Sequence, residues 1–150
     1  MYFPSHIAAG LVIGKLTGDY TTAVVASIFP DSDHLYAFIK HGYFKNWKKF
    51  VDTVVKQEDV YDDQRNYFHN IFVAIGFWII VMLINFQVGL VFSISYFFHL
   101  VMDALDGAEY YPLYPKKKVN LKGPIGYFSK YDMAVSIFLT IVFVALTLIV

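Results

Sequence analysis

The sequence predicts an all-α fold, an integral membrane helical bundle of about five hydrophobic segments, the first two of which are short. Hydrophobic residues make up 57% of the 150 residues, charged residues only 16%, and the mean hydropathy is +0.50. A typical soluble domain has roughly 45–50% apolar and about 25% charged residues. Because the chain is short enough for one domain, residues 1–150 are expected to form a single membrane-embedded helical domain.

Apart from His99, residues 70–102 form the longest region without Asp, Glu, Lys, Arg or His. This region is too long for one membrane span of about 20 residues, and the polar and flexible residues 85–89 predict a turn within it. We therefore expect two helices over residues 69–85 and 88–105. A further apolar stretch, Met133–Val150, is long enough to cross a bilayer if it is not tilted.

The two N-terminal apolar segments are Ile7–Gly14 and Tyr20–Phe29, and Pro30 is expected to end the second. Neither segment is longer than about 11 residues, or roughly 16 Å of helix, so neither crosses a bilayer unaided. They form either a short hairpin extended by neighbouring residues or a re-entrant element. Lys40–Arg65 and Asp106–Asp132 are expected to be polar connections.

Helices that reverse at Gly18 and near Gln87 would place the N-terminus, residues 31–68 and residues 106–131 on one face of the bundle. Eleven of the twelve Lys and Arg residues then lie on that face, and only Lys15 lies opposite. The positive-inside rule makes this face cytoplasmic. The expected location is therefore the cell (inner) membrane, with several passes and direct contact with bilayer lipid.

All five histidines fall on the same face, together with several aspartates. His99 and Asp103 are four residues apart, so both side chains project from one face of a helix. Ionisable groups within apolar segments are costly and are usually functional. The seven candidate metal ligands are His6, Asp31, Asp33, His34, His69, His99 and Asp103.

The chain has no cysteine, so a metal here would be held by nitrogen and oxygen ligands alone. Imidazole and carboxylate ligands suit divalent metals, with zinc as the first expectation and manganese or iron as alternatives. Seven ligands exceed the needs of one tetrahedral ion, which favours a site for two ions. Arg65, four residues before His69, is suited to clamp an anionic oxygen with its two-pronged guanidinium.

Each feature also has a structural interpretation without chemistry. Asp31 alone is typical of a helix cap or turn, His99 and Asp103 of a hydrogen-bonded pair in a bundle, and Arg65 of an interfacial anchor. His41, in a loop, is interpreted as a polar interfacial residue. The basic residues 116–118, beside the aromatic residues 110–114, are typical of a topology signal with an aromatic belt, or of a site for anionic lipid headgroups.

Four blocks of the chain resemble the YdjM-like family of membrane-bound metal-dependent hydrolases, which itself resembles zinc-dependent phospholipase C and P1 nuclease. Two departures stand out, because Gln64 replaces a family histidine and Asp106 replaces a threonine. The resemblance implies hydrolase activity and carries Arg65 and His69 over as site residues. The four blocks are Ser5–Gly10, Phe29–His34, Gln64–Asn70 and His99–Leu105.

The combined prediction is a membrane-bound metal-dependent hydrolase that cleaves a phosphoester, a phospholipid being one candidate substrate. Bound metal would activate a water, Asp31 or Asp33 would accept its proton, and Arg65 would stabilise the developing negative charge. The alternatives are a metal-binding transporter or sensor, and a structural membrane protein without catalysis. The zero net charge suggests no nucleic-acid partner, and the oligomeric state is left open.

Overall fold

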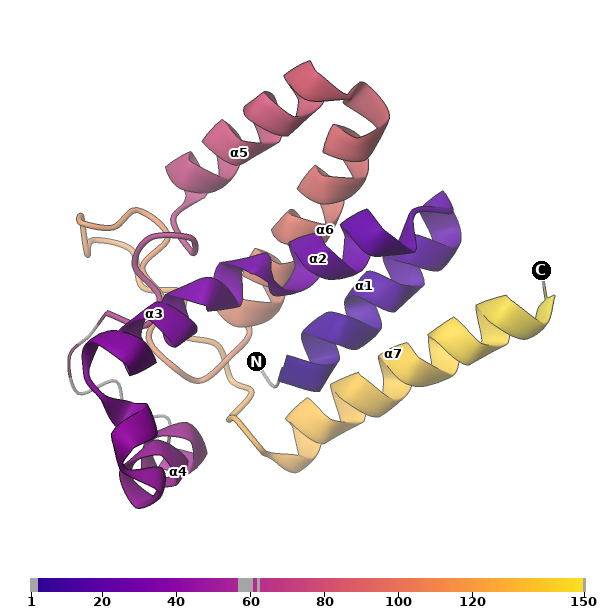
Figure 1. The fold of residues 1–150 in the computed structure, drawn as a ribbon. Helices are drawn as coiled ribbons and strands as arrows, with labels where there is room; N and C mark the ends of the chain where they lie inside the picture. Colours follow the sequence, from indigo (N-terminus) through magenta and orange to yellow (C-terminus); the bar gives the residue numbers. More distant parts are fainter. Residues whose placement is uncertain (1–2, 57–60, 62, 150) are drawn as a thin grey trace.

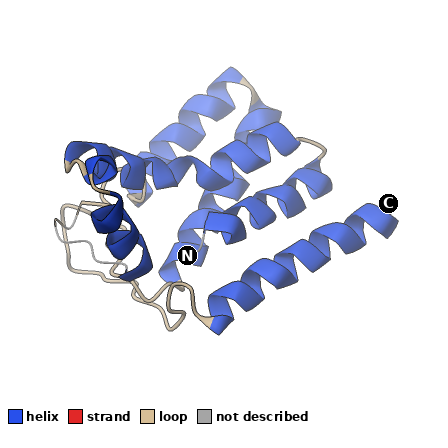
Figure 2. Ribbon diagram, turned by 60° about the horizontal axis from the view of Figure 1, so that its bottom comes forward, coloured by secondary structure: helices blue, strands red, loops and turns tan. Residues whose placement is uncertain are grey.

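The structure is a computed structural model that describes residues 3–56, 61 and 63–149. Within these residues the protein is all-helical, and the only strand-like pairing is an isolated bridge between Asp106 and Ile125 (Figure 2). This confirms the predicted all-α class. The helices are α1 (Phe3–Thr17), α2 (Tyr20–Ile28), η1 (Phe29–Asp31), α3 (Ser32–Lys40), η2 (Tyr43–Lys45), α4 (Trp47–Lys56), α5 (Ile71–Ile84), α6 (Phe86–Ala104) and α7 (Lys130–Ile149).

The five predicted apolar segments correspond to helices α1, α2, α5, α6 and α7. Among the described residues, two helices, α6 and α7, are long and apolar enough to cross a membrane, whereas α5 is apolar but shorter. The number of candidate spans is therefore smaller than the number of apolar segments. Helix α7 is mostly exposed, as expected of a helix that faces lipid.

Helices α1 and α2 form the predicted hairpin, which reverses at Gly18 (φ +80°). Asp19 then caps α2 by accepting a hydrogen bond from the Thr22 N–H at 3.0 Å. A Cβ atom on Gly10 would lie 2.9 Å from Val24 Cα, so this glycine lets the two helices approach closely. Helix α2 ends at Ile28, just before Pro30, as predicted, and the chain then continues through η1 into α3 (Figure 1).

Helices α5 and α6 form the second hairpin, and its turn is tighter than the sequence predicted. A single residue, Asn85, separates the two helices, and its side chain caps α6 by accepting from the Val88 N–H at 3.1 Å. A Cβ atom on Gly89 would lie 2.5 Å from Met82 Cα. The absence of a side chain at Gly89 therefore permits the close crossing of the two helices.

The two hairpins pack against each other through α1, α2 and α6, and α7 packs against α1. Helix α1 contacts α2, α6 and α7, and α2 contacts α6. In Figure 1, α7 runs beside α1 and away from the α5–α6 hairpin. A hydrogen bond between Ser5 and Ser136 joins α7 to the first turns of α1, so α7 is fixed next to the end of α1 that carries His6.

The first predicted polar connection, Lys40–Arg65, contains a helix, α4, that lies to one side of the bundle (Figure 1). This helix was not predicted from the sequence because of its lysines. Its apolar residues nevertheless recur at helical spacing, at Trp47, Phe50, Val51 and Val54. The second connection is a loop, as predicted. It folds back on the end of α6 through a hydrogen bond from the Gly107 N–H to the Ile125 carbonyl at 2.7 Å.

Candidate metal centre

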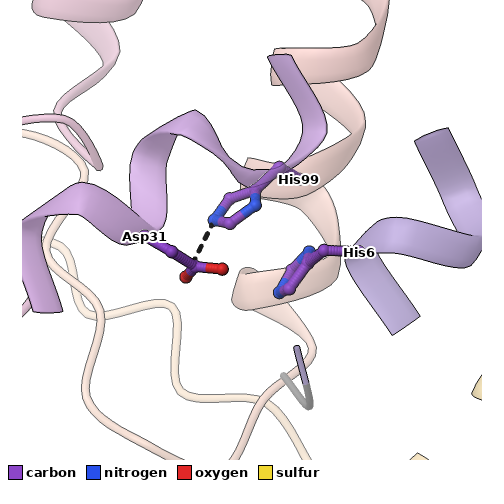
Figure 3. A group of neighbouring side chains, drawn as sticks. All are labelled: His6, Asp31 and His99. Carbon is purple, nitrogen blue, oxygen red and sulfur yellow. Dashed lines mark ion pairs between the residues drawn. The ribbon is translucent and has the colours of Figure 1, made fainter. Parts of the chain in front are cut away.

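The ends of four chain segments converge at one end of the bundle and bring six of the seven predicted ligands together. The metal-ligating atoms of these residues form three overlapping groups, in each of which all atoms lie within 4.8 Å of one another. The three groups are His6, Asp31 and His99 (Figure 3); Asp31, His34 and His69; and His69, His99 and Asp103. We call these six residues the donor cluster.

Each segment contributes ligands from a position that its local structure fixes. His6 lies in the first turns of α1, Asp31 ends η1, and His34 lies in the first turn of α3. His69 lies just before α5. Asn70 caps this helix, because the Asn70 Oδ1 atom accepts a hydrogen bond from the Phe72 N–H at 2.8 Å. The last turns of α6 carry the remaining two ligands, His99 and Asp103.

Two histidine nitrogens of the cluster, Nε2 of His69 and Nε2 of His99, lie close together. These two atoms are 3.3 Å apart, and Asp103 Oδ2 lies 3.0 Å from Nε2 of His69 and 3.7 Å from Nε2 of His99. Two nitrogens bound to one tetrahedral zinc at about 2.0–2.1 Å are themselves about 3.3 Å apart. The spacing of these atoms therefore fits the coordination of one small cation.

Three of the histidines have a polar partner at Nδ1, which leaves Nε2 as the nitrogen available to a metal. Nδ1 of His99 donates to the Ser27 carbonyl at 2.7 Å, and Nδ1 of His34 lies 3.1 Å from Gln64 Oε1. Nδ1 of His69 lies 3.1 Å from Asp33 Oδ2. A proton on each Nδ1 leaves the Nε2 lone pair directed at the cluster, which is the arrangement that metal-ligating histidines use.

His6 is the least satisfied polar side chain of the cluster. Its ring is fully buried and stacks on His99 with the centroids 3.9 Å apart. Neither ring nitrogen has a hydrogen-bond partner of good geometry among the described residues, although Nε2 lies 3.3 Å from Asp103 Oδ1. Buried polar atoms are rarely left in this state, so His6 provides a vacant donor for a bound cation.

Asp33 lies outside the donor cluster, although the sequence suggested it as a metal ligand and proton acceptor. Its Oδ2 atom accepts hydrogen bonds from the N–H groups of Tyr67, Phe68 and His69, at 3.0, 2.8 and 3.3 Å, besides contacting His69 Nδ1. These bonds occupy Oδ2 fully. In the structure Asp33 shapes the chain before α5 and orients the His69 ring.

Asp31 and His34 form the more accessible side of the cluster. The two side chains are 18% and 25% exposed, and the Asp31 Oδ1 to His34 Nε2 distance is 3.7 Å. Burial, followed by the positive charges of His69 and Arg65, lowers the pKa of His34 to about 3. His34 is therefore neutral at physiological pH, as a metal ligand must be.

Arg65 lies between two carboxylates at the edge of the cluster. Its Nη2 donates to Asp106 Oδ2 at 2.5 Å, and its Nε lies 3.5 Å from Asp103 Oδ2. Burial opposes the charge, but Asp103 and Asp106 raise the pKa of Arg65 above its usual value. Its buried Nη1 has no hydrogen-bond partner among the described residues, which leaves one donor for an anionic oxygen.

The chain was compared with protein families, curated proteins and solved structures. The family model of the YdjM inner membrane protein matches residues 1–150. The chain belongs to the YdjM inner membrane protein family. Searches of curated proteins and of solved structures found no match. The resemblance seen in the four sequence blocks is therefore confirmed for the YdjM family.

Two of the departures from the YdjM pattern have a clear place in the structure. Gln64, which replaces a histidine, supplies the oxygen that holds His34 Nδ1. Asp106, which replaces a threonine, is fully buried and pairs with Arg65. Burial by itself raises the pKa of Asp106, but nearby positive charge, including that of Arg65, lowers it overall, so the carboxylate stays ionised.

Sequence reasoning missed two tyrosines that support this YdjM-family site. Tyr110, predicted to lie in an aromatic belt, is buried and donates to the His69 carbonyl at 2.8 Å. Tyr96 donates to the Phe68 carbonyl from α6. Tyr96 lies three residues before His99 on the same helix, so the two side chains share a helix face. This spacing was the sequence feature that could have placed Tyr96 at the site.

His41 lies apart from the donor cluster, as its interpretation as an ordinary polar residue implied. Its Nε2 lies 2.8 Å from Asp63 Oδ2, and its ring stacks on Tyr61 with the centroids 3.7 Å apart. His41 is therefore a useful reference histidine for experiments on the metal centre.

The charges of the site, taken together, favour a cation at its centre. Asp33, Asp103 and Asp106 are at most 1% exposed, and Arg65 forms ion pairs with Asp103 and Asp106. Buried carboxylates require a compensating charge. Burial lowers the pKa of His69, yet bonds to Asp103 and Asp33 raise it overall, so the position between these groups attracts positive charge.

Proposed function

We propose that this YdjM-family protein is a metal-dependent hydrolase of the inner membrane that cleaves a phosphoester, with a phospholipid as one candidate. The observation that carries the proposal is the 3.3 Å approach of His69 and His99 Nε2 beside Asp103, with Arg65 at the edge. The likeness of the family to zinc-dependent phospholipase C and P1 nuclease stays a prediction from sequence.

The donor set suits zinc, with manganese or iron as alternatives, because it combines imidazole nitrogen with carboxylate oxygen and has no thiolate. Six donors are more than one tetrahedral ion requires, and Asp31 belongs to two of the three groups. The surplus of donors supports a site for two ions. When bound, divalent metal lowers the pKa of water and polarises a phosphoryl oxygen.

The protein's own residues supply the remaining steps. Asp31 lies at the pocket wall and is the most accessible carboxylate of the cluster, so it is placed to accept a proton from water. Arg65 Nη1 donates to the phosphoryl oxygen on which negative charge develops. Asp33 takes no proton in this scheme, because its Oδ2 atom holds His69 and the preceding backbone.

The position in the membrane completes the proposal. Helices α6 and α7 cross the bilayer, and the α1–α2 and α5 segments pack against them within the protein. The donor cluster and most of the basic residues share one end of the bundle. By the positive-inside rule, that end faces the cytoplasm.

The test is hydrolysis by the purified protein in lipid nanodiscs, loaded with zinc or manganese, against phospholipids and soluble phosphodiesters. Arg65→Lys keeps the positive charge but loses the guanidinium fork. We expect kcat to fall about 10²–10³-fold with metal content unchanged, while Lys15→Arg at the other end of α1 leaves both unchanged. Failure to turn over any of these esters, with metal bound, would contradict the proposed activity.

A further inference from the structure

A pocket of about 960 Å³ opens beside the donor cluster, and its walls are of two chemical kinds. Asp31, His34 and Arg65 form a polar wall. The volume lies at the upper end of the range of about 300–1,000 Å³ that is usual for small-molecule sites. The apolar wall is formed by Leu35, Phe38, Phe44, Phe50 and Val54.

The apolar wall is a packed aromatic group between α3, η2 and α4. The centroid of the Phe38 ring lies 6.2 Å from that of Phe44 and 5.4 Å from that of Phe50. The centroids of Phe44 and Phe50 are 5.3 Å apart. Phe44 is nevertheless 54% exposed and Leu35 53% exposed. Large apolar side chains that remain open beside a pocket indicate an apolar occupant.

The two walls are continuous along α3. His34 and Phe38 are four residues apart on the same helix, and their ring centroids are 6.3 Å apart. One helical turn, about 5.4 Å, therefore separates the donor cluster from the aromatic wall. A molecule that contacts both must carry a polar group and an apolar chain close together, which is the structure of an amphiphile.

Helix α4 carries apolar side chains both at the pocket and on its outer side. Phe50 and Val54 line the pocket, whereas Trp47, Val51 and Val55, at four-residue spacing, are 73%, 37% and 57% exposed. The helix is thus apolar on its outer side as well. A helix with exposed Trp and Val beside several lysines is typical of one that lies in the interfacial plane of a bilayer.

We propose that the α3–α4 pocket binds the hydrocarbon chain of an amphiphile whose headgroup lies at Arg65 and the donor cluster. The nature of the headgroup, a phosphoester, rests on the proposed function. The binding of the chain rests on the pocket alone. Phe38, Phe44, Phe50 and Val54 are then the residues that select for the chain.

Photo-crosslinking tests this proposal without any need for turnover. The probe is dodecyl phosphate with a diazirine in the middle of its chain, added to the protein in phosphatidylcholine nanodiscs, once with EDTA and once with zinc. After irradiation, mass spectrometry locates the labelled residues. We expect labels on residues 35–54, and competition by unlabelled dodecyl phosphate but not by inorganic phosphate. Labels restricted to lipid-facing helices such as α7 would overturn the proposal.

Two neighbouring residues of α4 give a matched pair of variants. Val54→Trp fills the pocket and should reduce labelling of residues 35–54 at least about tenfold, since each buried methylene contributes about fourfold to affinity. Val55→Trp adds the same side chain at an exposed position and should leave labelling unchanged. Equal labelling in both variants would overturn the proposal. The labelling map of the unsubstituted protein decides the matter if Val54→Trp does not fold.

This experiment separates the chain-binding proposal from the proposed hydrolysis. Specific labelling of the pocket, without turnover of any phosphoester in the nanodisc assay, would support chain binding and contradict the hydrolase. Turnover of phospholipid without labelling of residues 35–54 would support the hydrolase and overturn chain binding.

Discussion

His69 and His99 face each other across the candidate metal centre with their Nε2 atoms 3.3 Å apart. Each ring is fixed from behind, by Asp33 and by the Ser27 carbonyl respectively. Two imidazole lone pairs repel at this distance unless a proton or a metal ion lies between them. The pair therefore links the fold, which brings α6 to the chain before α5, with the proposed chemistry.

Asp33→Asn should weaken metal binding without abolishing it. Asparagine is similar in size and keeps an oxygen for the backbone N–H groups, but it removes the charge that orients His69. Loss of such a supporting carboxylate typically costs about 10–100-fold in metal affinity. Competition with a fluorescent zinc chelator measures the affinity. An unchanged affinity would show that Asp33 does not support the metal centre.

Gly10→Ala should destabilise the protein through the α1–α2 contact. The added Cβ atom would lie 2.4 Å from Ser27 Oγ and 2.9 Å from Val24 Cα. Such overpacking costs about 1–3 kcal/mol, and it displaces the residue whose carbonyl holds His99. Thermal unfolding in detergent measures the loss.

The matched control for Gly10 is Gly76 in α5, where an added Cβ atom meets nothing within 4 Å. Gly76→Ala should be neutral or stabilising by up to about 1 kcal/mol, because alanine favours a helix more than glycine does. Equal unfolding temperatures for the two variants would refute the close approach of α1 and α2.

The ion pairs of Asp63 should make stability depend on acid pH. Burial alone raises the pKa of Asp63, but the bonds from Lys40 and His41, each 2.8 Å long, lower it overall. A carboxyl group with a lowered folded pKa stabilises fully above its unfolded value of about 3.9 and loses this contribution as the pH falls through the folded value.

Asp63→Asn should therefore lower the unfolding temperature at pH 7 by about 2–4 °C, corresponding to about 1 kcal/mol for a partly exposed pair. The difference from the unsubstituted protein should shrink as the pH falls below about 4. A difference that is constant from pH 7 to pH 3 would show that these ion pairs do not stabilise the fold.

The orientation in the membrane is testable because the chain has no cysteine of its own. Gln87→Cys places a single thiol in the first turn of α6, and Lys117→Cys places one in the loop that follows the other end of this helix. Helix α6 has 19 residues and is about 28 Å long. A membrane-impermeant maleimide, added from the outside of the inner membrane, should label Gln87→Cys alone. Labelling of Lys117→Cys alone would reverse the orientation, and equal labelling would mean that α6 does not cross.

Much of this architecture was predictable because apolar segments and ligand types are local features of the sequence. The five apolar helices and the convergence of His6, His69 and His99 followed from segment ends alone. The different roles of Asp31 and Asp33 did not, because the course of the chain through η1 into α3 decides which carboxylate faces the cluster. Helix α4 was missed since its lysines masked its apolar positions.

The measurement that tests the metal centre most directly is anomalous diffraction at the zinc edge, from crystals of protein purified without chelator and supplied with zinc. We expect an anomalous peak about 2.0–2.1 Å from Nε2 of both His69 and His99, and none beside His41. Ordered rings without such a peak, with His69 Nε2 hydrogen-bonded directly to Asp103, would contradict the metal centre.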